Sequence, residues 1–186
     1  MTEGFIPPHG GYEDLLSYQK ALIVFDATVS FCERFIDKRS RTHDQMIQAA
    51  RSGKQNIVEG SMASGTSKAT EIKLTNVARA SLEELLEDYQ DFLRTKKLPL
   101  WEKDHPQAQK VRRLAYGSDV TYGAYETYVE KGSPEVAANT IICLIHQANY
   151  LLDQQLKNLE EAFVKEGGMR ERMTHARLKH RGKPEA

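Results

Sequence analysis

The residues of this chain that could do acid–base or metal chemistry are dispersed along the sequence. Of the six histidines, only His146 falls within a stretch of helical apolar periodicity, and the others lie in connecting or terminal segments. A di-metal helical bundle needs a Glu three residues before a His on two helices, and the segment around His146 has no such pair. We expect no metal site and no catalytic residue, and we interpret His146 as a polar position at the edge of a core.

The cysteines and one acidic row are the other groups with chemical potential. Cys32 and Cys143 are each surrounded by apolar residues at helical spacing and lack a fixed basic neighbour, which favours buried, reduced and inert thiols. Five carboxylates fall within nine residues, namely Glu83, Glu84, Glu87, Asp88 and Asp91. We interpret them as the solvated face of a helix. Phosphate-binding, dinucleotide and zinc motifs are absent from the sequence, so we expect no enzymatic activity, no cofactor and no evident small-molecule substrate.

Four segments with helical apolar periodicity must position whatever surface the protein uses. We expect helices at about residues 13–37, 42–60, 67–95 and 134–166. In the first segment, apolar residues follow one another at alternating steps of three and four: Leu15, Tyr18, Leu22, Phe25, Val29, Cys32 and Ile36. This spacing is typical of helices that pack at a shallow angle. The sequence therefore predicts an all-α protein with an antiparallel up-and-down four-helix bundle.

The second predicted helix has small residues where the first has large ones. Its expected inward positions are Met46, Ala50, Gly53 and Ile57. An interior Gly costs about 1 kcal/mol relative to Ala, so Gly53 should lie against a close neighbour. We place the N-cap at Thr42, with Gln45 completing a capping box, and the end of the helix at Gly60.

The third and fourth predicted helices have longer apolar faces. The third should begin at Ser67 and bury Leu74, Ala78, Leu82, Leu85, Tyr89 and Phe92. The fourth should begin at Ser133 and end at Gly167, and it should bury Ala138, Ile141, Ile145, Ala148, Leu152, Leu156, Leu159 and Phe163. Its apolar stripe is broader than a two-helix contact requires, which leaves room for a contact with a second subunit.

An elaborated connection at residues 96–133 joins the third and fourth helices, with a short helix expected at about 106–116. It contains the only tryptophan, Trp101, and half of the eight tyrosines, namely Tyr116, Tyr122, Tyr125 and Tyr128. These amphipathic rings could cover one end of the core, or they could contact another chain, because Tyr and Trp are enriched at interfaces. The sequence leaves both interpretations open.

The charge distribution separates a bundle domain, residues 1–167, from a basic tail, residues 168–186. The whole chain has 26 basic and 26 acidic residues; the tail holds six of the former and two of the latter, so its formal charge is +4 and that of the domain is −4. The tail cations are Arg170, Arg172, Arg177, Lys179, Arg181 and Lys183, and Arg51 and Lys54 add cations on the second helix. These residues could bind RNA or DNA if several tails converge, or the tail could be a solubilising extension.

The length and apolar content of the chain favour one globular domain. Its sequence has no apolar run of about 20 residues, which a membrane span needs. Residues 1–11 also lack the charged-then-apolar pattern of a secretory signal. We therefore expect no membrane association and a cytoplasmic location.

Three motifs together resemble a known protein family. They are Gln19-Lys20-Ala21, Asn56-Ile57-Val58-Glu59-Gly60 and Ala78-Arg79-Ala80-Ser81-Leu82-Glu83-Glu84-Leu85. In this order and spacing they are similar to the small bacterial four-helix bundle proteins named for intervening sequences of 23S ribosomal RNA genes. The likeness covers about residues 12–95, and the remainder resembles a longer branch with a C-terminal suffix. Within the motifs we expect structural roles for Asn56, Glu59, Gly60, Arg79 and Ser81.

The resemblance implies an antiparallel bundle that assembles as a ring of subunits, commonly a pentamer, with no established enzymatic activity. One relative is an accessory subunit of a reverse transcriptase, for which a basic surface that meets nucleic acid is proposed. We therefore expect a non-enzymatic homo-oligomeric scaffold or interaction protein. The alternative is a nucleic-acid-binding accessory factor that acts through clustered basic tails. By helix rise alone, an ion pair between Glu59 and Arg79 requires an asymmetric connection between their helices.

Overall fold

The computed structural model describes residues 6–116 and 121–181, and every regular element in these ranges is helical. In chain order the elements are η1 (Tyr12–Asp14), α1 (Leu16–Phe35), α2 (Arg41–Ala63), α3 (Lys68–Thr95), α4 (Pro106–Leu114), η2 (Tyr122–Ala124), α5 (Glu126–Glu130), α6 (Pro134–Glu166) and α7 (Met169–Arg181). The prediction of an all-α protein is confirmed. None of the helices in these ranges is both long and apolar enough to cross a bilayer.

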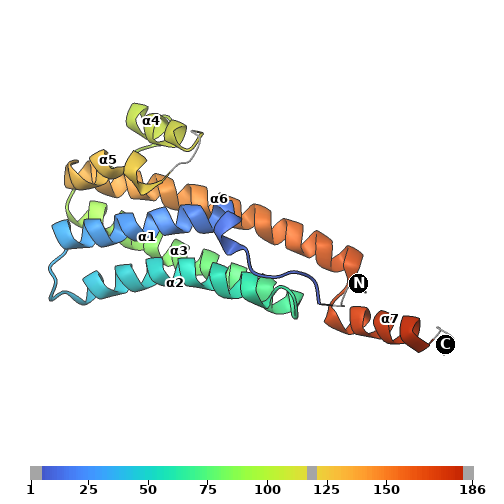
Figure 1. Ribbon diagram of the computed structural model, residues 1–186. Helices are drawn as coiled ribbons and strands as arrows, with labels where there is room; N and C mark the ends of the chain where they lie inside the picture. The colour runs from blue at the N-terminus through green and yellow to red at the C-terminus, as the bar shows by residue number, and fades with distance from the viewer. Residues whose placement is uncertain (1–5, 117–120, 182–186) are drawn as a thin grey trace.

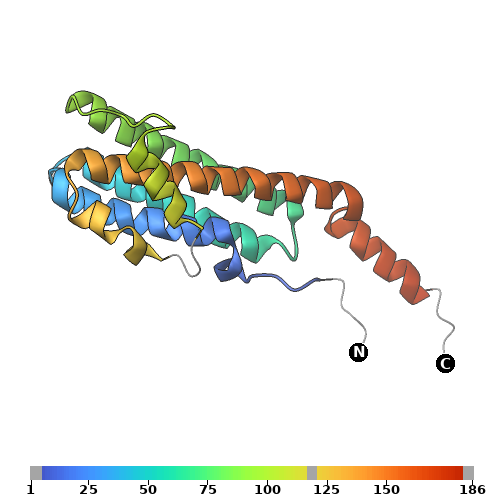
Figure 2. The ribbon, with the colours of Figure 1, turned by 90° about the horizontal axis from the view of Figure 1, so that it is seen from above.

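The four long helices α1, α2, α3 and α6 lie side by side, and α7 continues beyond one end of them (Figure 1). α1 packs against α2 and α6, and α3 packs against the same two helices. The connection between α3 and α6 carries α4 and α5, and both of these short helices contact α6. Seen from above, α4 crosses α6 (Figure 2). The short helix predicted at about 106–116 is therefore present as α4.

The ends of α2 differ from the prediction. Its N-cap is Ser40, whose Oγ accepts a hydrogen bond from the Thr42 backbone N–H at 3.2 Å, so the predicted cap at Thr42 is wrong. The predicted end at Gly60 is also wrong, because α2 continues to Ala63. A Cβ on Gly60 would lie 3.4 Å from both the Glu71 carbonyl oxygen and the Leu74 Cβ. This glycine therefore lets α3 approach α2 closely rather than ending the helix.

The predicted starts of α3 and α6 are confirmed by side-chain caps, whereas α1 spans Leu16–Phe35, a shorter range than the predicted 13–37. Ser67 Oγ accepts from the Thr70 N–H at 3.1 Å at the start of α3, and Ser133 Oγ accepts from the Val136 N–H at 3.3 Å at the start of α6. Gly167 follows α6 with a φ of 69°, a conformation that favours glycine.

The buried face of α1 is not the one that the apolar spacing predicted. Buried residues include Ser17, Ala21, Val24, Thr28 and Phe31, whereas Leu15, Tyr18, Leu22, Phe25, Val29 and Ile36 are only partly buried. Of the predicted stripe, Cys32 alone is fully enclosed. Smaller side chains face the neighbouring helices, and one of them, Thr28, accepts a hydrogen bond from the Tyr89 hydroxyl at 3.1 Å. The larger apolar residues instead cover the margins of the core.

The faces predicted for the other long helices are largely confirmed. All four inward positions of α2 are buried, and so are those of α3 except the partly buried Leu74. On α6, the predicted inward positions from Ala138 to Leu152 are buried, and so is Leu159. Leu156 is half-buried and Phe163 is 42% exposed. The acidic row on α3 is exposed apart from a half-buried Asp88, as expected for a solvated face.

The aromatic connection mainly covers the core of its own chain. Trp101 and Tyr125 are buried, and Tyr122 and Tyr128 pack against the core at its margin. Tyr116 differs, because 88% of its surface is exposed. The Arg34 guanidinium of α1 donates hydrogen bonds to the backbone carbonyls of Val129 and Gly132, which holds α5 against the long helices.

Candidate functional site

The predicted basic tail forms the helix α7 over most of its length. Its first turn is fixed by Glu171, whose Oε2 accepts a hydrogen bond from the Gly168 N–H at 2.9 Å. Hydrogen bonds from the backbone N–H groups of residues 171 and 168 lower the pKa of the Glu171 carboxyl. This carboxylate therefore stays ionised at the positive end of the helix dipole.

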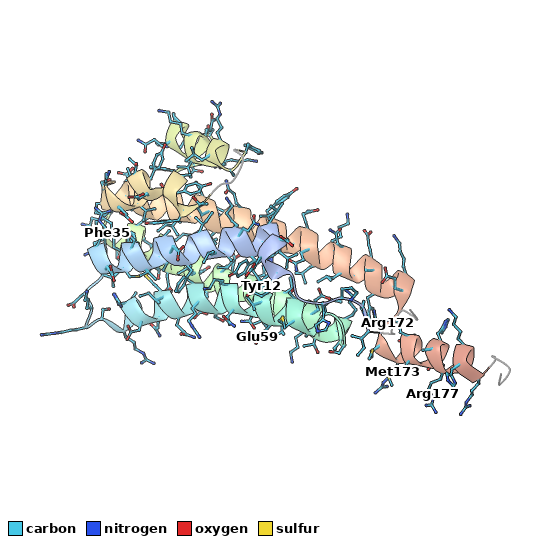
Figure 3. The ribbon with its side chains drawn as sticks, in the orientation of Figure 1. Tyr12, Phe35, Glu59, Arg172, Met173 and Arg177 are labelled. Atoms are coloured by element: carbon cyan, nitrogen blue, oxygen red, sulfur yellow. The ribbon has the colours of Figure 1, made fainter. Side chains whose placement is uncertain are left out.

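The cations of α7 form two rows on the helix. Arg170, Arg177 and Arg181 are seven and four residues apart and share one face, while Arg172 and Lys179 share the opposite face. All of them are exposed except Arg172, which is half-buried. Figure 3 shows Arg172 at the end of α7 nearest the body and Arg177 farther out. The predicted contact residue Lys183 lies outside the described residues.

The half-buried Arg172 has an unusual environment. Its Nε and Nη2 atoms are shielded from solvent, and within the described part of the chain they have no hydrogen-bond acceptor. A buried guanidinium N–H without an acceptor costs free energy. An acceptor from another molecule would remove this cost.

Between its cationic rows α7 has a narrow apolar seam. Met169, Met173, Ala176 and His180 follow one another at steps of four, three and four, which places them on one face. Met173 is 43% exposed. Leu178 elsewhere on α7 and Val164 near the end of α6 are 62% and 78% exposed. We refer to residues 163–181 as the C-terminal projection, because its apolar side chains have few partners in the body of the chain.

The predicted cations of α2 are not brought together with those of α7. Arg51 is exposed on α2, and Lys54 Nζ lies 4.5 Å from the ring centroid of Phe25 on α1. The Lys54 charge also partly offsets the desolvation that raises the pKa of Asp26. Lys54 therefore packs against α1, and the two predicted groups of cations form separate surfaces, since α7 lies beyond the end of α2 (Figure 1).

Two of the motif residues, Asn56 and Ser81, are linked through Ser52 in a polar contact between α2 and α3. Asn56 Nδ2 donates to the Ser52 carbonyl oxygen at 2.8 Å, and Ser52 Oγ lies 2.9 Å from Ser81 Oγ. Ser81 Oγ also donates to the Val77 carbonyl oxygen at 3.0 Å. The sequence interpretation missed Ser52, although it stands four residues before Asn56 on the same helix face.

The remaining charged motif residues do not pair with each other. Arg79 Nε donates to Asp153 Oδ1 on α6, and this hydrogen bond is the main cause of the raised pKa of Arg79. Glu59 is exposed on α2. Glu59 and Arg79 therefore do not form the ion pair that an asymmetric connection would have allowed, because Arg79 faces α6 rather than the end of α2.

A groove that the sequence did not reveal lies between α1, α6 and the connection that carries α4 and η2. Its volume is about 1370 Å³. Apolar and aromatic side chains provide much of its lining, among them Leu22, Ile23, Trp101, Tyr116, Ile142 and Tyr150. Leu22 belongs to the stripe that was predicted to face the core. The groove exists because α1 turns part of that stripe away from the other long helices.

The groove wall contains one buried lysine. Lys20 is 8% exposed, its Nζ donates to the Tyr125 hydroxyl at 3.3 Å, and it lies 5.4 Å from the centroid of that ring. Burial lowers the pKa of Lys20 and raises that of Tyr125 to about 12. Desolvation therefore acts against the charged form of both groups.

Another part of the wall brings together Arg112, Cys143 and His146. Arg112 Nη1 donates to the Lys103 carbonyl oxygen at 2.6 Å. Burial raises the pKa of the Cys143 thiol, and the nearby Arg112 only partly opposes this effect. Burial also lowers the pKa of His146. The nearby Arg112 charge lowers this pKa further, and the Glu83 charge raises it. A protonated thiol beside a neutral imidazole is not an activated nucleophile.

Within residues 6–116 and 121–181, no group of three or more His, Cys, Asp or Glu side chains could hold a metal ion. No protein-family model, curated protein or solved structure matches the chain. The resemblance based on the three motifs therefore stays a prediction.

Proposed function

We propose that the protein is a non-enzymatic helical scaffold that self-associates through its C-terminal projection. The observation that carries this proposal is the apolar seam of α7, which has few partners in its own chain. Met173 on this seam is 43% exposed, and Phe163 and Val164 just before α7 are 42% and 78% exposed. A second copy of the chain offers an identical seam, and identical surfaces related by a twofold axis are self-complementary.

The length of α7 supports the same conclusion. α7 has 13 residues. Isolated helices shorter than about 12–15 residues are marginal in water, and most helices gain their stability from packing an apolar face. No extensive packing joins α7 to another described helix. A partner helix whose apolar residues recur at the same steps of four and three would supply the missing contacts.

The arrangement of the body supports a four-helix bundle of the predicted up-and-down type. Each of α1, α2, α3 and α6 contacts two of the others in a closed cycle. We propose on this basis, and on the three motifs, that the chain is related to the proteins of the 23S ribosomal RNA intervening sequences. The twofold seam alone gives a dimer, so a closed ring of five subunits, which the resemblance implies, would need a second, head-to-tail interface.

The proposal is tested by measuring mass in solution. Light scattering coupled to size exclusion should give a multiple of the chain mass of 21.1 kDa. Met173→Glu places a charge in the seam and should shift the protein to the monomer. Met62→Glu is the matched control, because Met62 is another exposed methionine, 52% exposed on α2 and outside the C-terminal projection. A wild-type monomer, or equal masses for both variants, would reject the seam as the interface.

A second candidate function is nucleic-acid binding, favoured by the one-sided row of Arg170, Arg177 and Arg181. These three guanidinium groups are exposed and flank the seam, so they would remain accessible in a paired α7. Several copies of the row in one assembly would add weak phosphate contacts together. The half-buried Arg172, with two N–H groups that lack acceptors, is a further donor on α7.

Fluorescence anisotropy with labelled RNA and DNA oligonucleotides tests this function at a series of salt concentrations. Replacing Arg170, Arg177 and Arg181 with Gln should weaken binding and reduce the logarithmic salt slope by about 0.7–0.9 for each phosphate that the variant no longer neutralises. The control variant replaces the exposed Arg39, Arg41 and Arg113 with Gln, which changes the net charge equally. An equal decrease in affinity for both variants would show that net charge alone, and not the row, determines binding.

A further inference from the structure

The groove between α1, α6 and the connection has no role in the proposed scaffold function. Its volume of about 1370 Å³ is larger than the roughly 300–1,000 Å³ that is common for small-molecule pockets. The side chains at its rim expose much apolar surface, with Leu16 at 65%, Leu100 at 48% and Tyr150 at 63%. An elongated apolar molecule would cover this surface and gain free energy from its removal from water.

One cation in the groove wall lacks a counter-charge. Lys20 is 8% exposed and its Nζ is hydrogen-bonded only to the neutral Tyr125 hydroxyl. None of the ion pairs among the described residues includes Lys20. Burial of an ammonium group is costly unless an anion or several acceptors compensate for the lost water, and one phenol and its ring do so only in part.

Lys20 is the one buried side chain among the charged residues known to line the groove in the described part of the chain, because Glu102 and Lys103 are exposed and Asp26 and Arg112 are only partly buried. Arg112 donates to the Lys103 carbonyl oxygen and lies beside the Cys143 thiol. Asp26 also lines the groove, and the charge of Lys54 on α2 partly offsets its desolvation. Lys20 is therefore the buried cation of this groove wall that lacks a counter-charge among the described residues.

We propose that the groove binds a long-chain carboxylate. The apolar chain lies along the walls formed by residues such as Ile23, Trp101 and Ile142, and the carboxylate accepts a hydrogen bond from Lys20 Nζ. The ligand supplies the negative charge that Lys20 lacks, while the Tyr125 hydroxyl continues to accept from Lys20 Nζ. The groove then selects for the charged head as well as for the apolar chain.

The single tryptophan provides a direct readout, because Trp101 lines the groove. Energy transfer from Trp101 to the fluorescent polyene carboxylate cis-parinaric acid should appear on titration of the full-length protein. Oleic acid should displace this probe at least about tenfold more effectively than oleyl alcohol, which has the same chain without the charge. This difference in affinity is expected because one charge-assisted hydrogen bond contributes roughly a factor of ten to binding.

Two variants distinguish head-group recognition from unspecific apolar binding. Lys20→Met retains the length and apolar body of the side chain and should remove the preference for the acid over the alcohol, with circular dichroism as the test of folding. Lys73→Met, at an exposed position of α3, should retain the preference. The proposal is overturned if energy transfer is absent, if the alcohol competes as well as the acid, or if folded Lys20→Met keeps the preference.

Discussion

Gly53 of α2 lies directly against Leu82 of α3. A Cβ on Gly53 would be 2.7 Å from Leu82 Cδ2 and 2.8 Å from its Cγ. Leu82 is fully buried and has little space into which it could move. Gly53→Leu should therefore lower the free energy of unfolding by at least about 1–3 kcal/mol, the usual cost of overpacking. Urea denaturation of the purified variant measures this decrease.

A double-mutant cycle isolates the contact between these two residues. Gly53→Ala gains about 1 kcal/mol of helix propensity but clashes with Leu82. In a Leu82→Ala background the clash is absent, so the same substitution should be more favourable by about 0.5–3 kcal/mol. Equal effects of Gly53→Ala in both backgrounds would show that the helices can adjust at no cost.

The ion pair between Arg79 and Asp153 should contribute little to stability. Their side chains are 37% and 49% exposed, and pairs at such positions are worth about 0–1 kcal/mol. Arg79→Ala should therefore cost less than about 1 kcal/mol in urea denaturation. A cycle with Asp153→Ala should show coupling, whereas a cycle with Glu59→Ala should show none. Coupling to Glu59 alone would contradict the observed geometry.

Stability should decrease at high pH because buried tyrosines resist ionisation. Burial raises the pKa of Tyr125 from 10.0 to about 12. Since the folded pKa is above the unfolded one, this stability is fully present below pH 10 and is lost as the pH rises towards about 12. Tyr125→Phe should reduce the decrease in the free energy of unfolding by up to about 1.4 kcal/mol per pH unit between these two pH values.

Tyr116 is the matched control for this pH effect. It is 88% exposed, so Tyr116→Phe should leave the pH dependence of urea denaturation unchanged. Lys20 acts in the opposite direction, because its lowered pKa makes stability rise with pH up to 10.5. The profiles are therefore compared above pH 10.5, where Lys20 no longer contributes to the pH dependence. Identical profiles for Tyr125→Phe and the wild type would contradict the burial of this hydroxyl.

The Cys32 thiol should be inert in the folded protein. Burial, with a smaller effect of Asp88, raises the pKa of Cys32 from 9.0 to about 12. At pH 8 this shift lowers the thiolate fraction about 1,000-fold. Reaction with Ellman's reagent should therefore be slow until denaturant is added, and Cys143→Ser isolates the signal of Cys32. Rapid reaction of native Cys143→Ser would contradict the buried position of Cys32.

The class of the fold and most helix faces could be predicted because they depend on local spacing. The apolar steps located α2, α3 and α6 well, and Ser67 and Ser133 marked two helix starts. The face of α1 could not be found in this way. Its buried side carries Ser17, Ala21 and Thr28, whose position depends on the close approach of neighbouring helices rather than on their own hydrophobicity.

The sites were less predictable than the fold. The cations of α7 were visible in the sequence as a charge imbalance, but their arrangement in two rows required knowing that residues 169–181 form one helix. The groove could not be predicted, because Lys20 and Tyr125 are 105 residues apart and meet only when α1, α6 and the connection are packed. The role of Gly60 could not be predicted either, since a glycine near a helix end can terminate the helix or allow a neighbouring helix to approach closely.

The most direct test of self-association through the C-terminal projection is the mass of the full-length protein in solution. Light scattering at several concentrations should give a stable multiple of 21.1 kDa for the wild type and for Met62→Glu, and a mass near 21.1 kDa for Met173→Glu. A wild-type protein that remains at 21.1 kDa at every concentration would contradict the proposal.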